Sequence, residues 1–306
     1  MANKNKSIEL RAFSIKSQNL TNDSAEYLNH LIDKLKKTKV KDRQMLINQD
    51  DPSGEQDVIS NYLIQDEDYD KNLCATFMRM SPNAVDEHID KKYFEANTFK
   101  IEDISVNETK TVAQHKGHFY LCMNDKFLVT ALLPKNTTIM RVQTYINWLL
   151  GISTLELTPI VEAPEGKKLS DLKSIKFSDP FCDEPDMFNE TVCLQDKLTT
   201  FMSKIFLDTD SLKNIDLKQI VSAELTLKLI KPKKMTEADY QQKYGAMLKP
   251  ISDLENITFK DNLGNSITGE KIRKIKPILI EQTDNGYISE QQLNTEMATF
   301  LRELNR

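Results

Sequence analysis

The chain of 306 residues lacks several features that would place it in a specialised class of protein. Its four cysteines, Cys74, Cys122, Cys182 and Cys193, are too few and too widely spaced for a disulfide framework, so we predict that all four are reduced. No apolar run approaches the roughly 18 residues of a membrane-spanning helix. The first residues lack the apolar core of a signal peptide. These absences favour a cytoplasmic protein.

The sequence also lacks the common motifs of nucleotide-binding and catalytic sites. There is no Walker loop, no Gly-x-Gly-x-x-Gly, no Gly-x-Ser-x-Gly and no His-Glu-x-x-His. His115, His118 and Cys122 could ligate a metal, but no fourth ligand follows at the spacing of a zinc site. We therefore predict no metal, no cofactor and no enzymatic activity. The carboxylates from Asp66 to Asp70 leave one alternative open, a metal-dependent nuclease, because clustered oxygen atoms suit hard cations.

Charge is separated along the chain, although the net charge is only −5. Residues 50–70 contain eight acids and no lysine or arginine, whereas residues 34–43 contain six bases and one acid. Residues 228–276 contain eleven bases and six acids. Local charge decides where an anionic polymer binds, whatever the total. Ordinary solvated faces would also explain these clusters, and the acidic segment leaves open a protein-interaction module with an acidic face.

The densest basic cluster directly follows a predicted strand. Leu225, Leu227 and Leu229 alternate with polar residues, and Pro232 stiffens the chain beyond them. Lysines at the end of a rigid element can follow a phosphate backbone, and few aromatic residues lie among them to stack on bases. We therefore predict contact with the backbone of double-stranded DNA. The predicted contact residues are Lys231, Lys233, Lys234, Lys271, Arg273, Lys274 and Lys276, with a second footprint at Lys36, Lys37, Lys39, Lys41 and Arg43.

Hairpins and helices alternate without an internal repeat, which predicts an α+β fold of mostly antiparallel sheets packed by several helices. Asn124 and Asp125 predict a hairpin turn, and the helix that follows carries the only tryptophan, Trp148, which we expect to anchor the core. Thr236 and Ser289 are predicted helix N-caps. The segment 162–168 contains Pro164 and Gly166 and indicates a linker. Two α+β domains are therefore predicted, at 1–162 and 163–306, with a single intertwined unit as the alternative.

Several segments between about residues 73 and 268 resemble the RexA-like phage exclusion proteins. The similar points are the hairpin ending at Phe127–Leu133 with its following helix, then residues 206–209, 224–234 and 257–268. The resemblance implies a homodimer that binds DNA with little sequence preference. It also implies that the protein senses phage DNA or DNA–protein intermediates and signals to a membrane-protein partner encoded nearby. The RdgC-type DNA binders look similar, and Kiwa-type defence systems pair a DNA binder with a membrane protein in the same way.

Overall fold

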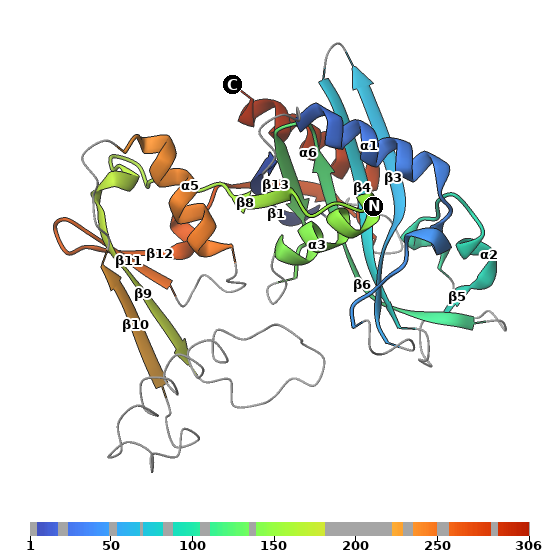
Figure 1. Ribbon diagram of the computed structural model, residues 1–306, viewed down its shortest axis with the longest axis horizontal. Coiled ribbons are helices and arrows are strands. Elements are labelled where there is room, and N and C mark those ends of the chain that lie inside the picture. The colour runs from blue at the N-terminus through green and yellow to red at the C-terminus, as the bar shows by residue number, and fades with distance from the viewer. Residues whose placement is uncertain are drawn as a thin grey trace. The chain divides into compact units, whose positions relative to one another are not determined.

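The structure of the chain is a computed structural model in which helices pack on antiparallel sheets (Figure 1). It describes residues 5–17, 24–48, 54–67, 70–81, 88–104, 111–134, 139–180, 222–228, 235–249, 257–282 and 287–305. The predicted α+β fold is confirmed. Within these ranges, no helix combines the length and the apolar character that crossing a membrane requires.

The chain divides into two compact units. Unit 1 comprises Met1–Pro134, Ile139–Pro159 and Lys274–Arg306, and unit 2 comprises Lys135–Thr138 and Ile160–Arg273. The passage from unit 1 to unit 2 between Pro159 and Ile160 lies close to the predicted boundary after residue 162. The predicted second domain, 163–306, differs from the structure, because residues 274–306 return to unit 1. There β13 (Ile275–Glu281) pairs with β1 (Asn5–Ser17) at the edge of the sheet.

The large sheet of unit 1 is antiparallel and has the strand order β13-β1-β7-β6-β4-β3-β2. Two further strands extend it, since β5 (His88–Asp90) pairs with β6 and β8 (Leu155–Pro159) pairs with β1. The remaining strands are β2 (Met45–Leu46), β3 (Gln56–Glu67), β4 (Asp70–Ser81), β6 (Thr111–Met123) and β7 (Phe127–Ala131). The predicted hairpin turn joins β6 to β7, where Asn124 Oδ1 accepts hydrogen bonds from the backbone N–H groups of Lys126 and Phe127.

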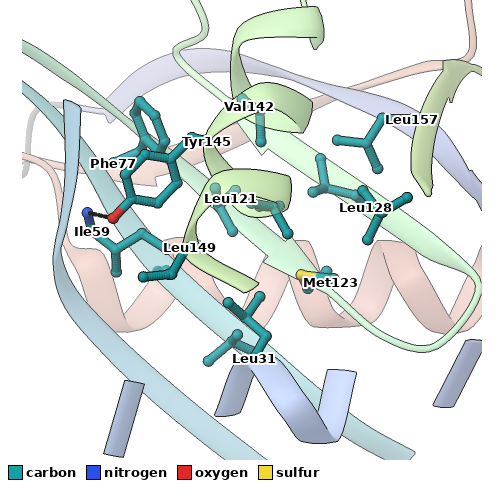
Figure 2. Close-up of a cluster of buried hydrophobic side chains, with 14 of the residues drawn as sticks. Leu31, Ile59, Phe77, Leu121, Met123, Leu128, Val142, Tyr145, Leu149 and Leu157 are labelled. Carbon is teal, nitrogen blue, oxygen red and sulfur yellow. Dashed lines mark hydrogen bonds between the residues drawn. The ribbon is translucent and has the colours of Figure 1, made fainter. Parts of the chain in front are cut away.

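One face of this sheet is covered by α1 (Ser24–Lys37) and α3 (Ile139–Leu150). Figure 2 shows Leu31 of α1 and Leu149 of α3 packing with Leu121 and Met123 of β6. Tyr145 is fully buried, and its hydroxyl accepts a hydrogen bond from the N–H of Ile59 at 2.9 Å. Burial of such side chains stabilises the layer by about 2 kcal/mol each.

The expectation for Trp148 is wrong. Its side chain is 39% exposed, because the helical period turns Tyr145, Ile146 and Leu149 toward the sheet and leaves position 148 beside the buried stripe.

The opposite face of the unit 1 sheet is covered by α6 (Glu290–Leu304). Ser289 caps this helix by accepting a hydrogen bond from the Gln292 N–H, as predicted. Leu293, Met297, Phe300 and Leu301 form its buried stripe. Short elements complete the unit, namely α2 (Lys91–Phe94) and the 3-10 helices η1 (Val40–Arg43) and η2 (Ile101–Asp103).

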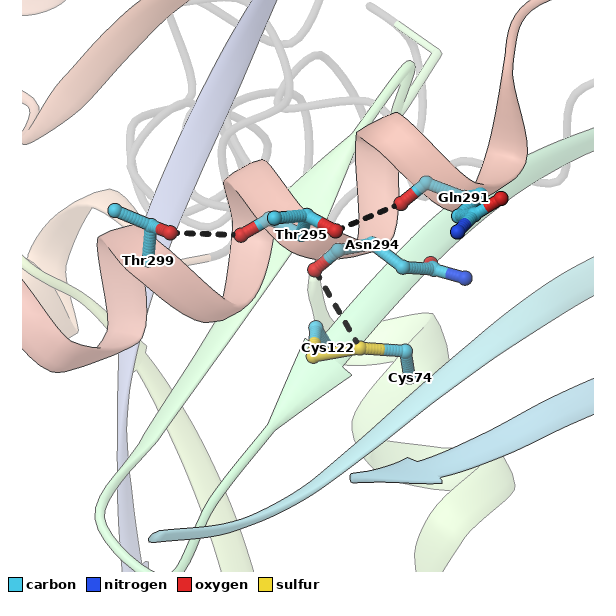
Figure 3. Close-up of a disulfide and its surroundings, with 6 residues drawn as sticks. All are labelled: Cys74, Cys122, Gln291, Asn294, Thr295 and Thr299. Carbon is cyan, nitrogen blue, oxygen red and sulfur yellow. Dashed lines mark hydrogen bonds between the residues drawn. A yellow bond between two sulfur atoms is a disulfide. The ribbon is translucent and has the colours of Figure 1, made fainter. Parts of the chain in front are cut away.

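Two cysteines meet beneath α6 (Figure 3). Cys74 on β4 and Cys122 on β6 are directly opposite each other in the strand register and form a disulfide. The prediction of reduced cysteines is therefore wrong for these two. A sequence separation of 48 residues gives no sign of the pairing, because the strand register creates it. Cys182 and Cys193 lie outside the described residues.

Unit 2 contains a smaller antiparallel sheet with the strand order β10-β9-β11-β12. These strands are β9 (Leu172–Pro180), β10 (Ser222–Lys228), β11 (Ile257–Asp261) and β12 (Ser266–Thr268). The helix α5 (Glu237–Leu248) packs on one face through Tyr240, Tyr244 and Leu248 (Figure 1). Thr236 caps this helix as predicted, in a capping box with Asp239. The 3-10 helices η3 (Leu169–Asp171) and η6 (Gly269–Ile272) lie at the ends of the strands.

Candidate nucleic-acid interface

Arg43 has no surface to offer to DNA, because its side chain is fully buried. Its guanidinium donates to the carbonyl oxygens of Lys39 and Asn97 and lies 5.7 Å from the centre of the Tyr62 ring. Burial lowers the pKa of this side chain. The prediction that Arg43 contacts DNA is therefore wrong. In the sequence Arg43 follows the basic end of a predicted helix, and nothing there indicates that η1 buries its side chain.

The other members of the second footprint are exposed. Lys36 and Lys37 lie in the last turn of α1, where cations interact favourably with the helix dipole. Lys39 and Lys41 both pair with Glu95, at 3.3 and 2.9 Å. A DNA phosphate would have to compete with this carboxylate for both lysines.

The basic run from Lys271 to Lys276 is divided between the two units. Lys271 is exposed on η6, and the backbone of Arg273 forms a β-bridge with Val161. Both residues belong to unit 2. Lys274 and Lys276 belong to unit 1. Lys276 Nζ forms an ion pair with Glu303 at 2.6 Å and lies over the Phe300 ring, which ties β13 to α6. Lys231, Lys233 and Lys234 lie outside the described residues, immediately beyond β10.

A basic surface that these predictions missed lies on the sheet of unit 2. The strand register places Lys228, Ser174, Lys260 and Ser266 in one row across the four strands. The next row contains Thr226, Lys176, Thr258 and Thr268. We call these two rows the lysine face. Successive side chains of a strand point to opposite faces, so the lysine face lies opposite the face that α5 covers.

Burial agrees with this placement. Ile175, Phe259 and Ile267 point toward α5 and are buried, whereas Lys228, Lys260, Thr226, Ser266 and Thr268 are exposed. Lys176, Ser174 and Thr258, on the two central strands, are partly exposed. Since neighbouring strands are about 4.8 Å apart, Lys228 and Lys260 are about 10 Å apart across β9. A phosphate near one lysine therefore lies within about one Debye length of the others at 0.1 M salt.

The chemistry of the lysine face suits a phosphate backbone. Its lysines offer positive charge, and the hydroxyl groups of its threonines and serines can donate hydrogen bonds to phosphate oxygens. Neither row contains an aromatic residue on which an unpaired base could stack.

The acidic segment divides into buried and exposed positions. Asp57 is fully buried on β3 and pairs with Arg141 of α3, whereas Asp66 is exposed near the end of the β3–β4 hairpin. Residues 49–53, 68 and 69 lie outside the described residues. Among the residues that the structure describes, no group of three or more His, Cys, Asp or Glu side chains could hold a metal ion.

A cluster of polar side chains lies where α6 begins. Glu290 Oε1 accepts a hydrogen bond from the Tyr120 hydroxyl at 3.2 Å. The His118 ring meets the Tyr120 ring edge-on, and His115 Nε2 lies 3.2 Å from His118 Nδ1. Partial burial raises the pKa of Glu290, and Lys100 acts in the opposite direction. These contacts therefore link the two histidines to the Glu290 carboxylate through Tyr120.

This carboxylate gives a pH-dependent prediction. Because the folded-state pKa of Glu290 is raised above its ordinary value of 4.5, the folded protein binds the proton more tightly than the unfolded chain does. Its contribution to the free energy of unfolding is therefore largest below pH 4.5 and falls as the pH rises through the folded-state pKa. The difference in stability between wild type and Glu290→Gln should fall over this window, as measured by urea unfolding at a series of pH values. A difference independent of pH would contradict the assignment.

Comparison of the chain with protein-family models, with curated proteins and with solved structures finds no match in any of the three. The resemblance to the RexA-like proteins therefore stays a prediction, and the proposals below depend on the geometry of the two units.

Proposed function

We propose that the chain is a DNA-binding protein that contacts the phosphate backbone of duplex DNA through the lysine face of unit 2. The observation that carries the proposal is the row of Lys228, Ser174, Lys260 and Ser266, together with Lys176 in the next row. These residues project from a sheet whose other face is held by α5. A rigid array of this kind binds without the entropic cost of ordering a loop.

The absence of aromatic side chains from both rows favours duplex over single-stranded DNA as the ligand. Single-strand binders gain about 1–3 kcal/mol per base from stacking on aromatic rings, which the lysine face cannot supply. Contacts to phosphates carry no sequence information, so binding should depend little on sequence. Lys231, Lys233 and Lys234 follow β10 directly in sequence, and we propose that they extend the same contact.

The wider role of the protein is a proposal that the resemblance supports. A RexA-like protein would be a cytoplasmic, non-enzymatic homodimer of an anti-phage defence system, with a membrane-protein partner. Light scattering of the purified chain tests the dimer directly. A mass near that of one chain at micromolar concentration would contradict it.

Fluorescence anisotropy with labelled duplexes of unrelated sequence, titrated between 50 and 200 mM salt, tests DNA binding. We expect similar affinity for all duplexes and weaker binding to a single strand of equal length. Three lysine–phosphate contacts give a slope of about −2.7 in a plot of log K against log salt, and further contacts make it steeper. No binding at micromolar protein and 50 mM salt would overturn the proposal.

A further inference from the structure

The disulfide of unit 1 joins two central strands of the sheet. Cys74 and Cys122 are directly opposite each other, with their Cα atoms 3.9 Å apart. Facing side chains are closest in the non-hydrogen-bonded pairs of an antiparallel ladder, where the Cα atoms are about 4.5 Å apart. The separation of the two cysteines is shorter still. The two residues are 1% and 0% exposed. No thiol from solution can reach either sulfur atom while unit 1 keeps this arrangement.

Among the residues that the structure describes, the helix α6 covers the disulfide. On β6, Phe119, Leu121 and Met123 point toward α1 and α3, so Cys122 points to the opposite face, where α6 lies. Figure 3 shows α6 running directly across the two sulfur atoms. The carbonyl oxygen of Asn294 lies 4.0 Å from Cys74 Sγ. Leu293 and Met297, which flank this residue on α6, are both fully buried.

The helix α6 can leave the sheet without breaking a strand ladder. Its polar anchors lie mainly toward its ends, where Glu290 accepts from Tyr120, Gln292 accepts from the Glu281 N–H, and Glu303 pairs with Lys276. Between them the contact is the apolar stripe. A helix held in this way opens more readily than the central strands it covers.

We propose that Cys74 and Cys122 form a redox-sensitive lock whose exchange with small thiols is gated by α6. When α6 lifts, a glutathione thiolate attacks one protein sulfur and breaks the S–S bond, giving a mixed disulfide and one protein thiolate. A second glutathione thiolate attacks the glutathione sulfur of the mixed disulfide and releases the other protein thiolate. The two protein thiolates take up the two protons that the glutathione thiols released. The sum is one protein disulfide and two glutathione thiols converted to two protein thiols and one oxidised glutathione. Oxidation is the reverse, with oxidised glutathione as the oxidant.

The lock changes the stability of unit 1. Oxidation closes a loop across the sequence separation of 48 residues, which restricts the unfolded chain. The oxidised protein should therefore melt about 10 °C above the reduced protein. The variant Cys74→Ala with Cys122→Ala should melt at the same temperature with or without glutathione, which separates this effect from any response of Cys182 or Cys193.

The experiment measures how fast the disulfide is reduced by glutathione in the full-length protein, with thiols trapped by alkylation and counted by mass spectrometry. Cys182 and Cys193 are replaced by serine in every sample. Leu293→Ala loosens α6 and should speed reduction at least tenfold. Leu31→Ala is the matched control, since both leucines are fully buried but Leu31 is in α1, on the other face of the sheet. It should change the rate by less than about twofold.

If Leu293→Ala does not fold, a milder pair of substitutions is used for the same measurement. Ser289→Ala removes the N-cap of α6, and Thr236→Ala removes the N-cap of α5 in unit 2. Only the first should speed reduction, by about fivefold. Two results would overturn the proposal. One is that oxidised glutathione fails to produce the Cys74–Cys122 bond. The other is that the variants away from α6 speed reduction as much as those in it.

Discussion

Replacing Lys176, Lys228 and Lys260 together by glutamate is expected to lower the affinity for duplex DNA about 1000-fold at 50 mM salt. Each neutralised phosphate contributes about 0.9 to the slope of log K against log salt, so three contacts contribute about 2.7. Loss of the three contacts should reduce the slope by that amount and weaken binding to all sequences alike. The measurement is anisotropy over a salt series, with circular dichroism to establish that the variant folds.

The matched control for the lysine face is a lysine on the other layer of the same unit. Lys243 is exposed on α5, and Lys260 is exposed on β11, so the two positions differ mainly in the layer they occupy. We expect Lys260→Glu to weaken DNA binding and to lower the salt slope by about one, whereas Lys243→Glu leaves both near the wild-type values. Equal effects of the two substitutions would show that only the total charge of the chain matters.

Local signals in the sequence predicted the elements that depend on a few neighbouring residues. The turn at Asn124 and the caps at Thr236 and Ser289 each depend on a side chain bonding to a backbone N–H within three residues. The pairing of β13 with β1 depends on partners that are far apart in sequence, so the return of residues 274–306 to unit 1 had no local signal.

The lysine face shows the same limit. The alternation of Leu225 and Leu227 predicted the strand that carries Lys228, but Lys228 was not among the predicted contact residues. Lys176 had no signal of this kind, because β9 follows the predicted linker and was not recognised as a strand. Only the register of β9 with β10 and β11 brings the three lysines together. The prediction for Arg43 was wrong because its burial also depends on residues distant in sequence, Asn97 and Tyr62.

Substituting the buried acid of unit 1, Asp57, is expected to have a large effect on the stability of the protein. Asp57 of β3 is fully buried and accepts two hydrogen bonds from Arg141 of α3, and the guanidinium Nε of Arg79 on β4 lies 3.8 Å from it. It was one of eight acids in a segment of uniform charge, so nothing in the sequence distinguished it from its exposed neighbours. Asp57→Ala removes the carboxylate that Arg141 binds, whereas Arg79 still pairs with Glu55 at 3.4 Å.

We expect Asp57→Ala to lower the free energy of unfolding by about 3–5 kcal/mol, because breaking a buried ion pair from one side leaves an uncompensated charge. Adding Arg141→Ala should recover part of this loss, since the double variant removes the stranded guanidinium as well. The comparison is Glu102→Ala, which breaks the exposed pair with Lys100 and should cost at most about 1 kcal/mol. Urea unfolding measures all four proteins. A cost for Asp57→Ala as small as that for Glu102→Ala would mean that the ion pair adds little, and that α3 is held to β3 by apolar packing and by the hydrogen bond between Tyr145 and Ile59.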